Sequence, residues 1–172
     1  MKCRLTGRAV ERVRNTCSGA SAEGARARLY ALVTHADDCV GYNALWVFTH
    51  FSAEEIKWLE PKRNELVDIA LSTSHSGKRR LALNLLERLP ISVNDLRGDY
   101  LDFCLSKINS TEPYGIRALC LRQAFAQCRF YPELMAELEA EIELMDARGL
   151  STGMAAARRG VEKAVAAMRS GE

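Results

Sequence analysis

The sequence predicts an all-α fold, a short α-solenoid (an α-α superhelix) of about four to five helical hairpins. One observation is a repeat: Gly41, Gly77, Gly115 and Gly153 open similar segments at spacings of 36, 38 and 38 residues, and Gly7 stands 34 residues before Gly41. A fixed period of this size is typical of helical arrays, whose units bury apolar faces only against their neighbours. The other observation is that no segment alternates apolar and polar residues convincingly, as a strand would.

The composition is that of a globular protein. Of the 172 residues, 48% are hydrophobic and 27% charged, which is enough for one buried core. We expect a single domain over residues 1–172, with residues 1–20 and 153–172 as end caps. No apolar run approaches the roughly 18 residues of a membrane span, so no membrane partner is expected.

Six cysteines raise the question of a disulfide or metal framework. They form no Cys-x-x-Cys pair, and Cys3, Cys17 and Cys39 are widely spaced. Cys104, Cys120 and Cys128 lie among leucines and phenylalanines, where a free cysteine packs as a small hydrophobe. We therefore predict reduced thiols, no metal, no cofactor and a cytoplasmic location.

The first half of the chain divides into helices by its apolar stripes and capping residues. Residues 4–17 carry an apolar stripe opposite an arginine stripe, as the first helix of an array requires. Residues 22–34 repeat the apolar stripe, and Asp37 is expected to cap an almost wholly apolar helix that runs to about Phe51.

Proline and serine signals divide the segments that follow. Ser52 and Glu55 form a capping box for a short helix. Pro61 is expected as the first residue of a helix that ends near Ser72.

In the second half, Pro90 ends the helix that starts at Gly77, and Ser92 is expected to cap a helix over residues 93–107. Further turns precede Gly115 and follow Tyr131, and the last helix is expected to place Met154, Ala157, Val161, Ala164 and Met168 on one buried seam.

Two segments resemble the start of the second helix in a HEAT repeat. Residues 112–119, Glu-Pro-Tyr-Gly-Ile-Arg-Ala-Leu, have its proline turn, and residues 77–83 fit the same pattern. Residues 40–165 also resemble a group of short bacterial HEAT-like proteins, on three features: the Ala-Leu-Trp-Val helix, the Tyr-Pro-Glu-Leu turn at 131–134 and the pair Arg159-Gly160.

This resemblance implies a HEAT/ARM-like solenoid in which the glycine-started helices form the inner, concave layer, and it implies no activity. HEAT repeats usually carry an aspartate six residues before the arginine. Thr73 and Thr111 stand there in this chain, which removes the aspartate of the usual ladder between repeats.

Charge separates the two predicted layers, although the net charge of the chain is only +2. Basic residues outnumber acidic residues by 16 to 3 in the glycine-started segments, which are residues 2–17, 39–50, 77–89, 115–130 and 153–169. Acidic residues outnumber basic residues by 15 to 7 in the alternate segments, which are residues 21–34, 53–72, 92–109 and 131–147. A basic concave surface attracts phosphates or acidic protein segments. The plainer interpretation, that both faces are simply solvated, is slightly favoured because charge runs usually are.

The candidate binding residues lie in the glycine-started layer. Asn43, Trp46 and His50 share a helical stripe, on which the aromatic ring offers a platform. A tryptophan and a histidine on an apolar helix are, however, more often core residues with satisfied polar tips. The other candidates are the arginines Arg79, Arg80, Arg117, Arg122 and Arg158. No catalytic residue or metal ligand is predicted, since no histidine has a ligand-spaced partner.

Two functions from different classes follow. The prediction is a non-enzymatic scaffold whose basic concave face holds an acidic protein partner or polyanion. The alternative, by analogy of fold, is a nucleic-acid-binding protein or enzyme related to the HEAT-like DNA-alkylation-repair glycosylases. Such an enzyme needs an acidic residue beside aromatic rings in a basic cleft. The inner layer has only Glu11, Glu87 and Glu162, and none is next to Trp46, so the scaffold is preferred.

Overall fold

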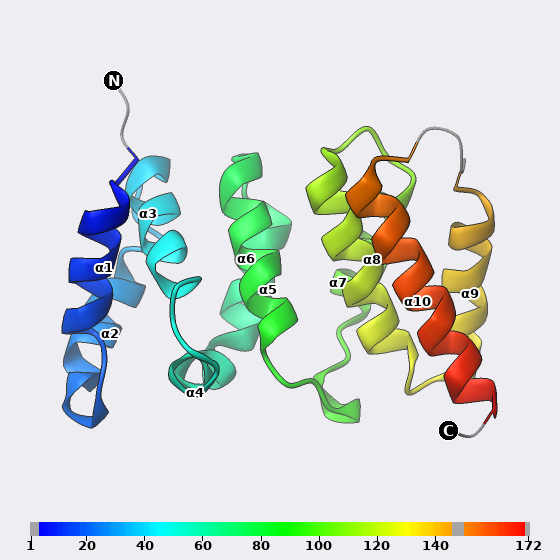
Figure 1. Cartoon of the computed structure of the whole chain (residues 1–172), viewed down its shortest axis with the longest axis horizontal. Helices are drawn as coiled ribbons and strands as arrows, with labels where there is room; N and C mark the ends of the chain where they lie inside the picture. Colours follow the sequence, from blue (N-terminus) through cyan, green and yellow to red (C-terminus); the bar gives the residue numbers. More distant parts are fainter. Residues whose placement is uncertain (1–3, 146–149, 171–172) are drawn as a thin grey trace. The chain divides into compact units, whose positions relative to one another are not determined.

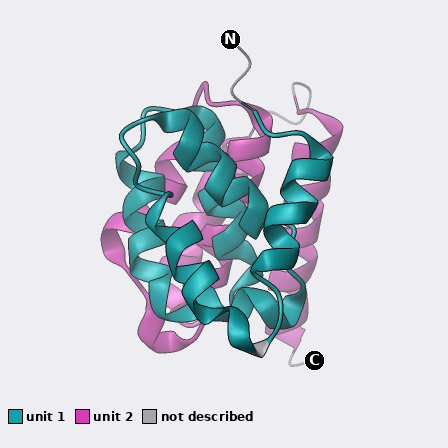
Figure 2. Cartoon of the chain, turned by 90° about the vertical axis from the view of Figure 1, so that its left-hand side faces the viewer, with its two compact units in different colours: residues 1–89 teal, residues 90–172 magenta. Residues whose placement is uncertain are grey.

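The computed structural model describes residues 4–145 and 150–170, and within these ranges it consists of helices and turns without strands (Figure 1). This confirms the all-α class. The chain divides into two compact units, residues 1–89 and 90–172 (Figure 2). The expected single domain with end caps stays a prediction. Of the six cysteines, Cys3 lies outside the described residues.

The first unit is built on three glycine-started helices, of which α3 contacts both α1 and α6, while α5 pairs with α6 as a hairpin. Leu45, Val47 and Phe48 of α3 are fully buried and form the middle of this core. The helices are α1 (Gly7–Thr16), α2 (Glu23–Ala31), α3 (Asp38–Phe48), α4 (Ala53–Ile56), α5 (Arg63–Ser72) and α6 (Ser76–Arg88).

The second unit centres on α8, which contacts α7, α9 and α10 (Figure 1). Its helices are α7 (Gly98–Ile108), α8 (Tyr114–Cys128), α9 (Pro132–Glu143) and α10 (Thr152–Ser170). The predicted seam of α10 is confirmed at Met154, Ala157 and Val161, which are buried, whereas Ala164 is only half-buried and its neighbour Val165, which was not predicted, is buried instead. The prediction was wrong for Met168, which is 47% exposed because it lies in the last turn of the helix.

Several helix starts follow the local signals of the sequence. The Asp37 carboxylate accepts a hydrogen bond from the Cys39 N–H at 2.8 Å and caps α3. Ser52 and Glu55 form the predicted capping box of α4. The helix bounds also match the charge segments of the sequence. The basic segments fall on α1, α6, α8 and α10, and the acidic segments fall on the helices between them within each unit.

Two predicted helix starts were wrong. Pro61 lies inside a 3₁₀ helix, Lys57–Lys62, and α5 begins at Arg63. Ser92 caps only the 3₁₀ turn Val93–Asp95, because its N–H and hydroxyl both bind the Asp95 carboxylate at 2.7 Å and close a single turn. Such short-range side-chain bonds compete with helix propagation, so α7 begins only at Gly98.

Four of the described cysteines, Cys17, Cys104, Cys120 and Cys128, are buried, and their reduced state stays a prediction. Burial, with a smaller contribution from the Glu137 carboxylate, raises the pKa of the Cys128 thiol to about 12. No helix in the described part of the chain has the length and apolar character needed to cross a membrane.

Candidate functional site

One arginine contact recurs in three helical hairpins. Arg26, Arg79 and Arg117 each donate an Nε hydrogen bond to the backbone carbonyl nine residues earlier, on the preceding helix or its C-cap. The acceptors are Cys17, Ala70 and Ile108, at 2.8, 3.1 and 2.8 Å. These are carbonyls that the last turn of a helix leaves without an intrahelical partner, so the guanidinium caps that helix and compensates its dipole.

This contact gives a structural role to two of the predicted binding arginines, Arg79 and Arg117, and a related carbonyl contact gives one to Arg158. Arg79 also donates through Nη2 to the Thr73 carbonyl at 2.5 Å. Arg158 donates through Nη1 to the Met145 carbonyl at 3.1 Å and pairs with Glu162 at 2.8 Å. Arg117 additionally lies over the Tyr114 ring, 5.2 Å from its centroid. The positive charges remain, but their positions are set by the ends of neighbouring helices.

A second set of polar contacts joins α3 to α6, one repeat apart. The Lys78 ammonium pairs with the Asp38 carboxylate at 2.9 Å, where both helices begin. Arg88 donates to the Thr49 and Phe51 carbonyls at 2.9 and 2.5 Å, where both end. Lys78 is only 7% exposed, so this lysine of the basic layer is neutralised by Asp38, whose pKa it lowers.

The two remaining arginine candidates differ in their surroundings. Arg80 is exposed on α6. Arg122 is half-buried on α8 and lines a hollow of about 400 Å³ between α8 and α10. Phe125 lies one turn further along α8, and α10 contributes Gly153, Ala156, Ala157, Gly160 and Val161. The hollow therefore has a basic and aromatic wall on one helix and a wall of mainly small residues on the other.

The stripe predicted on α3 is brought together only in part. Trp46 is half-buried and makes a T-shaped contact with His50, their centroids 5.7 Å apart. Asn43 instead turns to the N-terminal segment, where its Oδ1 accepts a hydrogen bond from the Leu5 N–H at 3.0 Å. Tyr42 takes the place beside Trp46, with ring centroids 6.5 Å apart.

Sequence reasoning missed two members of this aromatic group. Tyr42 precedes Trp46 by four residues, so the helical period contained the signal. His75, the N-cap of α6, contacts the Tyr42 ring at 5.8 Å. Its partnership depends on the packing of α3 against α6, which no local pattern in the sequence reveals.

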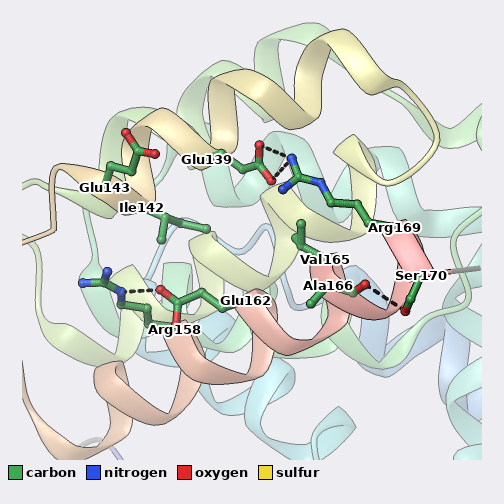
Figure 3. A pocket seen from close by; sticks show the side chains of 9 residues that line it. All are labelled: Glu139, Ile142, Glu143, Arg158, Glu162, Val165, Ala166, Arg169 and Ser170. Carbon is green, nitrogen blue, oxygen red and sulfur yellow. Dashed lines mark hydrogen bonds and ion pairs between the residues drawn. The ribbon is translucent and has the colours of Figure 1, made fainter. Parts of the chain in front are cut away.

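Another hollow, of about 620 Å³, lies between α9 and α10 (Figure 3). Ile142 and Val165 form apolar parts of its wall. The pair Arg158–Glu162 lies at one end and the pair Arg169–Glu139, at 2.7 Å, at the other (Figure 3). Arg158 lines this hollow, whereas Arg122 lines the hollow between α8 and α10. The two arginines therefore lie at different hollows on either side of α10.

The comparisons with known proteins agree with this repeated architecture. The model of a HEAT repeat domain matches residues 1–165, which is nearly the whole chain. The chain belongs to the HEAT repeat family. HEAT repeats generally serve as protein-interaction scaffolds. Neither a curated protein nor a solved structure matches the chain.

Proposed function

We propose that this HEAT repeat protein is a non-enzymatic scaffold that holds an acidic segment of a protein partner on its glycine-started helices, and that α8 and α10 of the second unit are the part that binds it. The observation that carries the proposal is the hollow between α8 and α10. Arg122 and Phe125 of α8 line it on one side, and the small residues of α10 line it on the other.

The rim of this hollow adds further positive charge. Arg159 and Lys163 are exposed on α10, and Lys163 follows Gly160 by three residues, which places it on the same side of the helix. A carboxylate that enters the hollow would meet Arg122 from one helix and Lys163 from the other. An arginine binds carboxylates well because its planar fork of N–H groups matches their two oxygens.

The shape of the hollow favours a polypeptide as its occupant. A Cβ atom added at Gly153 or Gly160 would meet nothing within 4 Å, so these glycines are not required by packing within this chain. Glycine in a helix interior costs about 0.5–1 kcal/mol relative to alanine. A backbone that approaches α10 closely would benefit from the missing side chains, while Phe125 offers it an apolar contact.

The test is binding of fluorescent poly-glutamate to the full chain at two salt concentrations. We expect binding that weakens as salt rises, because exposed charges are screened, and that falls roughly tenfold on Arg122→Glu. The matched control is Arg28→Glu, the same charge change at an exposed position of α2, outside the glycine-started helices.

A parallel measurement of duplex DNA binding and base release separates the scaffold from the repair enzyme. Poly-glutamate that does not bind at low salt, or that binds equally well to the Arg122→Glu variant, would refute the proposal. Tight duplex binding together with release of an altered base would favour the repair-enzyme alternative instead.

A further inference from the structure

The first unit carries a ridge of aromatic side chains along α3 and at the start of α6. We call Tyr42, Trp46, His50 and His75 the aromatic ridge. Tyr42 and Trp46 are half-buried and the two histidines are exposed. The neighbouring α3 residues Ala44, Leu45, Val47 and Phe48 are buried.

The two tryptophans of the chain have different environments. Trp58 stacks on the Phe48 ring, with centroids 6.1 Å apart, and its Nε1–H donates to the Glu23 carboxylate at 2.7 Å. This is the ordinary arrangement of a packed tryptophan with a satisfied polar tip. The Trp46 ring instead lies beside the Tyr42 and His50 rings of the ridge and under one described cation, Arg4.

Arg4 lies over the ridge. Its guanidinium carbon is 4.4 Å from the centroid of the Trp46 ring and 6.0 Å from that of Tyr42. Both distances are within the range of a cation–π interaction, for which tryptophan is the best aromatic partner. The next residue fixes the backbone, because the Leu5 N–H donates to Asn43 Oδ1 at 3.0 Å.

The segment that carries Arg4 is short and irregular. Arg4 and Leu5 precede the first residue of α1 and lie outside any helix, and Arg4 is exposed. The contacts of this short segment with α3 include the guanidinium on the Trp46 and Tyr42 rings, one backbone hydrogen bond to Asn43, and the half-buried Leu5 side chain, which lines a hollow with Val40 and Val47. Another chain that supplies an arginine followed by a backbone N–H would reproduce the contact with the rings and the hydrogen bond to Asn43.

We propose that the aromatic ridge and Asn43 form a binding site for an arginine side chain of a partner protein, and that Arg4 occupies this site within the free chain. The partner's guanidinium lies on the Trp46 ring in place of Arg4, and the N–H of its next residue binds Asn43 Oδ1 in place of that of Leu5. Because an internal occupant reduces the fraction of chains with an open site, Arg4 lowers the apparent affinity.

This inference does not rest on the proposal for α8 and α10, since it concerns the other unit and a ligand of opposite charge. Each can fail while the other holds.

The experiment titrates the dipeptide acetyl-Arg-Leu-amide into the full-length chain while the indole N–H signals of Trp46 and Trp58 are followed by NMR. We expect the Trp46 signal to shift and the Trp58 signal to stay, because Trp58 is packed against Phe48. The Arg4→Ala variant should bind about fivefold more tightly than the natural chain, which is the release expected when a weak internal competitor is removed. The Trp46→Leu variant lacks the reporting indole, so its titration is followed through the Asn43 side-chain amide signals, which should not shift.

Two matched comparisons make the outcome decisive. Acetyl-citrulline-Leu-amide has nearly the same shape without the charge and should bind far more weakly. Equal binding of the citrulline or the lysine analogue would overturn the assignment to arginine. An Arg4→Ala chain that melts like the natural protein but binds no more tightly would overturn the role of Arg4.

Discussion

At the scale of single residues, the arginines that cap helices should behave differently from those that lie exposed beside them. Arg117→Met keeps the apolar stem but removes the Nε hydrogen bond to the Ile108 carbonyl. We expect the free energy of unfolding to fall by about 1.5–3 kcal/mol, as for other hydrogen bonds that involve a charged group. Urea denaturation measures this change.

The control is Arg80→Met on α6, where the side chain is exposed. Its effect on the free energy of unfolding should stay within about 0.5 kcal/mol, as for most surface substitutions. If both variants lost the same free energy of unfolding, or if Arg80→Met lost more, Arg117 would not have the capping role.

Glu55 should contribute a pH-dependent part of the stability. The Ser18 hydroxyl, the Ser52 N–H and the Arg14 guanidinium hold the pKa of Glu55 down at about 2. An unfolded glutamate titrates near about 4.3, so its ionised form is favoured by folding. This contribution is complete above pH ~4.5 and is lost as the pH falls towards ~2.

The variant Glu55→Gln should therefore lose less stability than the natural chain between pH ~4.5 and ~2, as measured by thermal melting. The Glu54→Gln control changes a side chain that is 82% exposed, and its pH profile should match that of the natural chain. Parallel profiles for Glu55→Gln and the natural chain would exclude the shifted pKa.

Residue roles were the part of the site that the sequence predicted least well. Arg79 and Arg80 are identical neighbours in the sequence, yet Arg79 caps α5 through two carbonyls and Arg80 is exposed. The difference depends on how α5 packs against α6, and helical periodicity gives only the face of one helix. The Arg4 contact with Trp46 was missed for the same reason, since it joins residues 42 positions apart.

At the scale of helices, two glycines should respond oppositely to substitution by alanine. A Cβ atom at Gly41 would lie 2.5 Å from the Val33 carbonyl oxygen and 3.1 Å from Lys78 Nζ. Gly41→Ala should therefore destabilise the first unit by about 1–3 kcal/mol through overpacking.

Gly160→Ala meets open space in the middle of α10 and should stabilise by about 0.5–1 kcal/mol, because alanine is the better helix former. Urea denaturation of both variants gives the comparison. The same Gly160→Ala chain should bind poly-glutamate more weakly if a partner backbone approaches α10. A destabilised Gly160→Ala variant would show that the glycine is needed within the chain.

Helix positions were predicted well where the signals are local. Capping residues such as Asp37 and Ser52 act within four residues of a helix start, so the sequence contains the whole interaction. Irregular connections were predicted poorly. Pro61 and Ser92 are residues that typically start an α-helix, but each lies at a short 3₁₀ helix that does not continue as an α-helix.

At the scale of the whole molecule, the repeat period was the most informative signal. Each unit of a solenoid packs only against its neighbours, so one period carries the architecture of the entire chain. The contacts between Lys78 and Asp38 and between Arg88 and Thr49 span 40 and 39 residues, close to the glycine spacing. The repeat period predicts that helices one repeat apart are in contact. It does not predict which side chains form the ion pairs and hydrogen bonds between them.

The last helix should be essential for solubility, because end helices shield the apolar side of a repeat array. The buried residues Met154, Ala157, Val161 and Val165 line α10, and this helix packs on α8. Removal of residues 152–172 uncovers that surface, and we expect aggregation in sedimentation experiments. Val161→Asp, which buries an unpaired charge in the full-length chain, should have the same effect, whereas Lys163→Asp, at an exposed position of the same helix, should sediment as the natural protein does. A shortened chain that stays monodisperse and melts at an unchanged temperature would show that α10 does not close the array.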